Sequence, residues 1–295
     1  MNKKPLISVA ICTYNGEQFI RQQLDSILNQ SYTPIEIIAV DDCSLDNSYS
    51  ILCDYAAKYS NFTAVLNEQN LGYNKNFEKA INLCKGEFIA ISDQDDIWLP
   101  EKLKVLYDEI GEYGLIYSNS RLIDKEGNDL GKLLETRRLY NGNDPRVFIA
   151  DNTASGHTML IKKNFISDFL VVPHNMVYDM WFAFVAANQN QLYAINDALT
   201  MHRIHDSNFM HTFKSKTKND ELVNIEHVLK GVLTLKTLRH RRFFEKFYNR
   251  IINRNKSIIG NICFKIFFVL HAKTIFFLHG RSRLSSMNQA RKFYI

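Results

Sequence analysis

Three aspartates stand close together in the first third of the chain, in the stretch Ser92-Asp93-Gln94-Asp95-Asp96-Ile97-Trp98. They follow an apolar run, residues 88–91, that predicts a buried strand. Neighbouring carboxylates repel one another, and a bound cation relieves that repulsion. Oxygen ligands of this kind suit Mg²⁺ or Mn²⁺, and open α/β sheets bind ligands at the carboxyl ends of their parallel strands. The cluster therefore indicates a nucleotide-diphosphate site, although a helix cap and turn would use the same residue types.

Strand patterns alternate with helix patterns along the chain before these aspartates. The predicted strands are residues 6–12, 35–40, 63–66 and 88–91, and the predicted helices are residues 17–29, 46–59 and 74–84. This alternation is typical of a mostly parallel sheet flanked by helices, an α/β architecture. Polar and acidic residues recur where successive predicted strands end, so we expect them to share one cleft.

The composition is that of a folded protein. The chain has 295 residues, of which 46% are hydrophobic, which is enough for one sizeable core or for a domain with an appendage. Its five cysteines are scattered and never form a C-x-x-C spacing, so neither a disulfide framework nor a zinc site is indicated, and a reducing cytoplasm fits best. The first apolar segment is too short for a signal-peptide core, so export is not expected.

Charge is distributed unevenly along the chain. Residues 236–295 carry 14 lysines and arginines and one acid, a balance of +13, whereas residues 1–235 have a balance of −8. Residues 258–278 are also apolar, but Lys265 and Lys273 interrupt them, so they predict a helix in the membrane interface rather than a spanning one. The alternative is a helix packed on the rest of the protein with its basic face solvated. Nucleic-acid binding is disfavoured because the charge is interleaved with apolar residues.

Four motifs in the chain resemble glycosyltransferase family 2, whose domain has the GT-A nucleotide-sugar-binding fold. They lie at residues 8–16, 35–46, 70–72 and 93–100, and the resemblance covers roughly residues 5–210. The Asp-Gln-Asp-Asp-Ile-Trp form of the last motif resembles the bacterial rhamnosyltransferase-like branch, which builds O-antigen and capsule-type surface polysaccharides. The resemblance implies a GT-A catalytic domain at residues 1–215, followed by a basic helical region at residues 216–295.

The resemblance also implies roles for individual residues. Asp42 takes the pyrimidine edge and ribose of the donor, and Asp95 is the metal carboxylate. The other residues implied to contact the donor are Thr13, Tyr14, Asn15, Asn70, Lys75, Asp93, Gly156, His157 and Arg203. Other interpretations stay open for three of these residues: Asp42 as a helix cap, His157 as a satisfied core histidine, and Arg203 as the partner of a structural carboxylate. Cys43 stands where the family usually has glycine, which predicts an altered loop.

Two further segments bear on the chemistry. Asp179 stands just before a predicted buried helix, where an acid serves either as an N-terminal cap or as a catalytic base. Its stretch resembles the family's His-Asp-x-Trp motif, with Tyr178 in place of the histidine, and this resemblance implies the catalytic base. Residues 201–208 resemble the family's Tyr-Arg-x-His-x-x-Asn segment, which implies that Arg203 and His205 stabilise the leaving diphosphate. His205 is also an implied metal ligand.

Together these features predict an inverting, metal-dependent glycosyltransferase that uses Mn²⁺ or Mg²⁺ and a UDP- or dTDP-sugar donor. The expected acceptor is a lipid-linked oligosaccharide, and the expected location is cytoplasmic, peripheral on the inner face of the cytoplasmic membrane, with no nucleic-acid partner. Two alternatives remain: a catalytically inactive nucleotide-sugar-binding protein at the membrane, and a nucleotidyltransferase. The second would carry a glycine-rich basic phosphate loop near the N-terminus, which residues 13–16 do not resemble.

Overall fold

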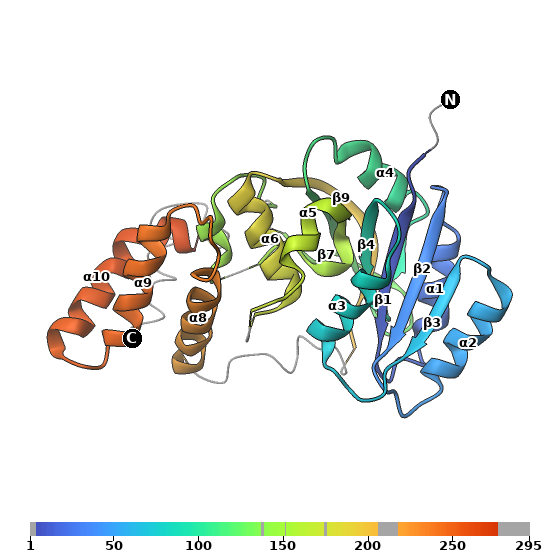
Figure 1. Cartoon of the computed structure of the whole chain (residues 1–295), viewed down its shortest axis with the longest axis horizontal. Coiled ribbons are helices and arrows are strands. Elements are labelled where there is room, and N and C mark those ends of the chain that lie inside the picture. The colour runs from blue at the N-terminus through green and yellow to red at the C-terminus, as the bar shows by residue number, and fades with distance from the viewer. Residues whose placement is uncertain (1–3, 137–138, 151, 174–175, 206–217, 277–295) are drawn as a thin grey trace. The chain divides into compact units, whose positions relative to one another are not determined.

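The computed structural model describes residues 4–136, 139–150, 152–173, 176–205 and 218–276, which are drawn as coloured ribbon in Figure 1. Its contacts divide the chain into two compact units. The sheet unit consists of residues 1–141, 154–171 and 191–206, and the helical unit of residues 142–153, 172–190 and 207–295. Each unit combines segments that are distant in sequence. This division does not coincide with the predicted boundary between residues 215 and 216. That boundary separates a catalytic domain from a basic helical region, and it stays a prediction.

The sheet unit is built around one nine-stranded sheet. Its strands follow the order β3-β2-β1-β4-β8-β6-β9-β5, with β7 paired to β6 outside this path. The strands are β1 (Ile7–Thr13), β2 (Ile35–Asp41), β3 (Phe62–Leu66), β4 (Phe88–Ser92), β5 (Ile97–Trp98), β6 (Leu115–Ile123), β7 (Asp129–Leu133), β8 (Met159–Lys162) and β9 (Leu192–Arg203). Strands β1 to β4 are parallel to one another, whereas β8 is antiparallel to β4 and β6. β6 and β9 are again parallel to each other.

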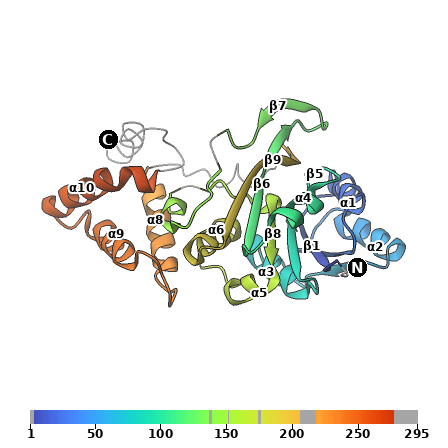
Figure 2. The same cartoon turned by 90° about the horizontal axis from the view of Figure 1, so that it is seen from above.

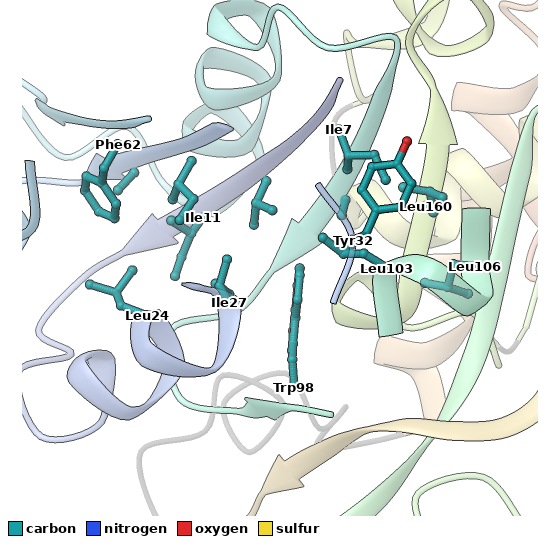
Figure 3. Packing of buried hydrophobic residues seen from close by; sticks show 14 of the residues in the cluster. Ile7, Ile11, Leu24, Ile27, Tyr32, Phe62, Trp98, Leu103, Leu106 and Leu160 are labelled. Carbon is teal, nitrogen blue, oxygen red and sulfur yellow. The ribbon is translucent and has the colours of Figure 1, made fainter. Parts of the chain in front are cut away.

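Helices connect the parallel strands, and their apolar faces form the core with the sheet. The helices of this unit are α1 (Ile20–Leu28), α2 (Ser48–Lys58), α3 (Tyr73–Leu83), α4 (Lys102–Glu109) and α5 (Lys163–Ile166), with 3₁₀ turns η2 (Gly156–Thr158) and η3 (Ser167–Phe169). In α1 the buried Ile20, Leu24 and Ile27 recur at helical spacing and belong to one buried cluster with residues of β1. Figure 3 shows Leu24 and Ile27 on the same side of the sheet as Ile11 of β1. The predicted α/β fold with a mostly parallel central sheet is confirmed.

The helical unit contains α6 (Tyr178–Gln189), α8 (Lys218–Val232), α9 (Arg241–Asn253), α10 (Ile258–Ile275) and the 3₁₀ turn η1 (Pro145–Phe148). Figure 2 shows α8, α9 and α10 grouped together. Aromatic rings join these helices: the centroids of Phe184 and Phe244 are 5.6 Å apart, and those of Phe247 and Phe268 are 5.1 Å apart. The described part of the predicted C-terminal region is thus helical. Residues 216–217 and 277–295, which complete it, lie outside the described residues, as do residues 206–215 of the predicted catalytic domain.

Candidate functional site

The three predicted aspartates lie in residues 93–96, the loop that joins β4 to β5 beyond the carboxyl end of β4. We call these residues the aspartate loop. Their carboxylates differ in exposure: the side chain of Asp96 is fully buried, that of Asp95 is 13% exposed and that of Asp93 is 36% exposed. The loop therefore turns one acid into the protein and leaves another accessible to solvent. This gradient distinguishes a structural acid from acids that can reach a ligand.

Asp95 pairs with His205, which lies two residues beyond the end of β9. The His205 Nε2 atom is 2.9 Å from Asp95 Oδ2. Burial raises the pKa of Asp95, and the neighbouring Asp96 and Asp93 charges act in the same direction, whereas the hydrogen bond from His205 lowers it. A bound cation would favour the ionised carboxylate. The structure thus brings together the two residues predicted to hold a metal ion, and that role stays a prediction.

Asp96 forms a second, more deeply buried cluster with two histidines. His202 Nδ1 lies 2.9 Å from Asp96 Oδ1, which also accepts a hydrogen bond from the Arg203 backbone N–H at 3.1 Å. His157 Nδ1 lies 3.7 Å from Asp96 Oδ2. The His157 and His202 rings stack with centroids 4.7 Å apart and planes 4° from parallel. Burial alone would raise the pKa of Asp96, but His202, His157 and these hydrogen bonds lower it below its usual range.

Both clusters contain donors that metal ions use, so each has to be tested against the geometry of coordination. The ligand atoms of Asp96, His157 and His202 lie within 4.8 Å of one another. However, the lone pair of an imidazole lies in the ring plane, so two parallel, stacked rings do not direct their lone pairs at one point between them. Asp95 and His205 have no stacked rings that would misdirect their lone pairs. The carboxylate oxygens of Asp95 and the nearby Asp93 suit a hard cation. The donor set that fits Mg²⁺ or Mn²⁺ is therefore that of Asp95 and His205.

His157 is 3% exposed, so its predicted contact with the donor would need it to reach the cleft from a buried position. Its Nε2 atom is 2.8 Å from Ser120 Oγ, and its Nδ1 atom faces Asp93 at 3.4 Å. Gly156 begins the same 3₁₀ turn and is also buried. The contacts of His157 match the open interpretation of a satisfied core histidine, and its role at the donor stays a prediction.

Arg203 is 1% exposed and connects several loops of the sheet unit. Its guanidinium donates to the backbone oxygens of Asp95 at 2.9 Å and Lys125 at 2.7 Å, and to Gln22 Oε1 at 2.7 Å. It also lies 4.8 Å from the Phe19 ring centroid. These contacts hold the backbone of the aspartate loop in place, so Arg203 supports the position of Asp95. Its predicted contact with a diphosphate stays a prediction.

Two residues at the site were missed by the sequence analysis. Lys102 is fully buried, donates to the backbone oxygen of His157 and lies 3.5 Å from the centroid of the Trp98 ring. Burial lowers its pKa, while Asp96 and Asp93 act in the opposite direction. The other missed residue is His202, which lies next to Arg203. The available signal was position in the sequence, because Lys102 lies two residues after the motif at 93–100 and His202 lies within the segment 201–208.

The β1–α1 loop lies against the aspartate loop. Gln94 Oε1 accepts a hydrogen bond from the Tyr14 N–H at 2.9 Å, and Gln94 Nε2 donates to the Tyr14 oxygen at 3.1 Å. Thr13 donates its hydroxyl to Asp41 Oδ2 at 2.7 Å, whereas the Tyr14 side chain is 47% exposed. Asn15 Oδ1 accepts from the Leu45 N–H at 2.8 Å. These predicted nucleotide contacts therefore lie beside Gln94 at the same end of the sheet as the aspartates.

The β2–α2 loop brings Asp42 against the segment that precedes α3. Asp42 is 3% exposed and accepts hydrogen bonds from the N–H groups of Leu71 at 2.8 Å and Gly72 at 2.9 Å. Asn70 donates to the Asp42 backbone oxygen at 3.1 Å, and Lys75 is exposed on α3. Cys43 has a φ of +66°, a left-handed conformation that glycine adopts more easily than cysteine.

Asp179 is the second residue of α6 in the helical unit. Its Oδ1 atom accepts a hydrogen bond from the N–H of Met180 at 2.6 Å. Tyr178 precedes it and is buried, with its ring 5.9 Å from that of Phe182. Asp179 thus belongs to a different compact unit from the aspartate loop, and its catalytic role stays a prediction.

Comparison with known proteins identifies the family to which the chain belongs. Residues 8–170 match the family described as glycosyl transferase family 2. TuaG of Bacillus subtilis, a glycosyltransferase named for teichuronic acid biosynthesis, is 33% identical over 135 residues, which is 45% of this chain and 54% of TuaG.

Two solved structures have a similar fold. Staphylococcus aureus TarS (residues 1–349) in complex with UDP-GlcNAc matches with a TM-score of 0.62, 19% identity and coverage of 91% of this chain and 81% of that one. The mannosyltransferase PcManGT of Pyrobaculum calidifontis, in complex with GDP-Man and Mn²⁺, matches with a TM-score of 0.56, 16% identity and coverage of 99% and 74%. With the family match spanning more than half of its length, this chain belongs to glycosyltransferase family 2 and has the GT-A fold.

Proposed function

We propose that the protein transfers a sugar from a nucleotide-diphosphate donor to a hydroxyl of a glycan acceptor, with inversion at the anomeric carbon. The observation that carries this proposal is the pairing of Asp95 with His205 at the carboxyl end of β4, beside Asp93 and the β1–α1 loop. This end of the sheet is where α/β folds bind nucleotides. The nucleotide-sugar and Mn²⁺ complexes of TarS and PcManGT are consistent with a donor and a metal ion at such a site.

The residues divide the chemistry between them. Asp95 and His205 hold Mg²⁺ or Mn²⁺, which when bound would neutralise charge on the departing nucleoside diphosphate. Asp179 accepts the proton of the acceptor hydroxyl as the acceptor oxygen forms a bond to the anomeric carbon. In the same step the bond between that carbon and the diphosphate oxygen breaks, so one displacement inverts the configuration. No covalent sugar intermediate is needed.

The acceptor that we propose is a lipid-linked oligosaccharide used to build a bacterial surface polysaccharide such as O-antigen or capsule. The naming of TuaG for teichuronic acid biosynthesis supports this class of product. A lipid-linked acceptor would explain why the basic C-terminal region is also apolar. We accordingly propose that the protein works at the inner face of the cytoplasmic membrane.

Calorimetric titration of the purified protein with UDP, dTDP and GDP, each with and without Mn²⁺, tests this function. We expect one nucleotide to bind tightly and only with Mn²⁺. Asp95→Asn should weaken that binding by at least about tenfold, since the metal loses a carboxylate ligand. Asp108→Asn is the matched control because Asp108 is a half-exposed acid paired with Lys104 on α4. Failure of all three nucleotides to bind the wild-type protein would contradict the proposal.

A further inference from the structure

Helix α10 has two apolar faces, and the described residues cover one of them. Phe264, Phe268, Ala272 and Ile275 are buried within the helical unit. Phe268 contacts Phe247 of α9, and the neighbouring Phe267 also contacts it, with ring centroids 5.3 Å apart. This face explains why α10 folds back on α9, because its apolar surface leaves water in doing so.

The opposite face of α10 leaves large aliphatic side chains in water. Those residues and their exposures are Ile258 at 81%, Ile259 at 74%, Ile262 at 50%, Ile266 at 53% and Leu270 at 66%. Four of the five recur every fourth residue, so they form a continuous strip along the helix. We call these five residues the isoleucine strip. An exposed apolar surface of this extent marks an interaction site more often than single exposed residues do.

A basic pocket lies beside the start of this strip. It has a volume of about 240 Å³ and is lined by Lys246, Asn249, Arg250, Asn253 and Gly260. Lys246 and Arg250 come from adjacent turns of α9, and Gly260 comes from the first turn of α10, directly after Ile258 and Ile259. Within the described residues neither cation forms an ion pair. Two cations and two amides around a pocket of this size offer the hydrogen-bond donors that a phosphate group accepts.

We propose that α9 and α10 bind an anionic phospholipid membrane, with the isoleucine strip in the interface and a lipid phosphate in the Lys246–Arg250 pocket. Charge favours this occupant, because residues 236–276 carry ten lysines and arginines and one acid and would repel a second copy of the same surface. An exposed apolar helix face beside basic residues suits the interface of a membrane that contains anionic lipid.

The same features argue against a helix that crosses the bilayer. By length and composition α10 is the one helix among the described residues that could span a membrane. Its 18 residues would reach about 27 Å, slightly less than the roughly 30 Å of hydrocarbon. More importantly, one side of α10 is already covered by protein, and Lys265 and Lys273 are exposed along it. The helix is therefore suited to lie in the interface plane.

Cosedimentation of the full-length protein with vesicles tests the proposal. We expect binding to vesicles of equal phosphatidylglycerol and phosphatidylcholine to be at least about tenfold tighter than to phosphatidylcholine alone. The double variant Ile262→Glu/Ile266→Glu should lose at least about tenfold in binding to the anionic vesicles. Lys246→Glu/Arg250→Glu should remove most of the preference for phosphatidylglycerol. Equal binding of the wild-type protein to both vesicles would overturn the headgroup site.

Two control variants carry the same chemical changes in the sheet unit. Leu130→Glu/Val171→Glu alters exposed apolar residues, and Lys85→Glu/Lys132→Glu alters exposed cations, so both should bind vesicles as the wild type does. If these controls lose binding as much as the α9 and α10 variants, the surface proposed is wrong. Sedimentation equilibrium without vesicles adds a second readout, because a wild-type dimer that Ile262→Glu/Ile266→Glu converts to a monomer would assign the strip to self-association and overturn the proposal. Vesicle binding requires no nucleotide, so this inference and the proposed catalysis can fail separately.

Discussion

At the scale of single residues, the proposed mechanism assigns the chemistry to one carboxylate. Asp179→Asn removes the group that accepts a proton but keeps nearly the same shape, so donor binding should persist. We expect kcat to fall by about 10²- to 10⁴-fold, the usual range for general base catalysis. Calorimetry of nucleotide binding and a turnover assay on the same preparation measure the two effects.

The exposed acid Asp168 provides the control for this experiment, since it lies in the 3₁₀ turn after α5 and away from any motif. Asp168→Asn should leave both kcat and nucleotide affinity unchanged. Parallel loss of binding and turnover in Asp179→Asn would instead indicate a structural role for Asp179.

His202 makes the stability of the sheet unit depend on pH. Burial lowers the pKa of His202, but Asp96 outweighs burial and raises it to about 9. Because this value lies above the unfolded pKa of roughly 6.5, the stabilisation is complete below that pH and is lost as pH rises through about 9. The lowered pKa of Asp96 reflects the same contact, so the interaction counts once. We expect the free energy of unfolding to fall by about 1–3 kcal/mol over this range.

Urea denaturation between pH 6.5 and 9.5 measures that fall. In His202→Gln the fall should largely disappear, whereas His240→Gln in the helical unit should retain it, since His240 is 42% exposed. A wild-type protein whose stability does not change across this range would show that His202 titrates near its ordinary pKa.

Sequence analysis identified the site residues for which the family resemblance implies a role, but it missed others whose importance depends on packing. It named Asp95 and His205, 110 positions apart, and the structure brings them within hydrogen-bond distance. It did not identify His202 or Lys102, because their roles depend on burial and on partners that are distant in the sequence. A lysine at the start of a helix is ordinarily solvated, and only tertiary packing places this one against Trp98.

At the scale of elements, the contact between the β1–α1 loop and the aspartate loop depends on a glycine. A Cβ atom at Gly16 would lie 2.2 Å from Gln94 Oε1, so Gly16→Ala must displace the Gln94 side chain. Gln94 would then lose its two hydrogen bonds to Tyr14. We expect a loss of stability of about 1–2 kcal/mol and weaker nucleotide binding. Chemical denaturation and calorimetry measure these effects.

A double-mutant cycle separates the steric cause from other effects of the alanine. If displacement of Gln94 is the cause, Gly16→Ala should add little to a protein that already carries Gln94→Ala. Additive losses in the double variant would mean that Gly16 matters for a reason independent of Gln94.

The strands that could be predicted are those with strong local patterns. The expected strands at residues 6–12, 35–40, 63–66 and 88–91 coincide with β1 to β4 within one or two residues at each end. These strands are apolar because helices cover the parallel part of the sheet. By contrast, β5 has two residues, β7 is exposed throughout, and β9 alternates irregularly over twelve residues. Their pairing partners, rather than their own composition, determine that they are strands.

At the scale of the whole molecule, each unit has its own core, so damage to one should leave the other folded. Phe244 in α9 is fully buried and contacts the rings of Phe184 and Phe243. Phe244→Ala should destabilise the helical unit by about 3–5 kcal/mol. Hydrogen exchange measured by mass spectrometry should show lost protection in α6, α9 and α10 and unchanged protection in β1 to β4.

Ile258→Ala provides the comparison, since Ile258 is 81% exposed and its removal leaves no cavity. It should change protection in neither unit. Loss of protection in the sheet unit of Phe244→Ala would mean that the two units unfold as one cooperative structure.

The pairing of β6 with β9 has a consequence for how the chain folds as it is synthesised. β6 ends at Ile123, but its parallel partner β9 ends at Arg203, and the chain between them contributes segments to both units. A nascent chain that has emerged only as far as residue 141 therefore holds β6 without β8 and β9, the strands on either side of it. The contacts of the aspartate loop with Arg203 and His205 also cannot form until β9 and the residues after it have been synthesised. The ribosome must thus synthesise about two thirds of the polypeptide before the end of the sheet that carries the aspartates can form completely, and unpaired strand edges are exposed until then.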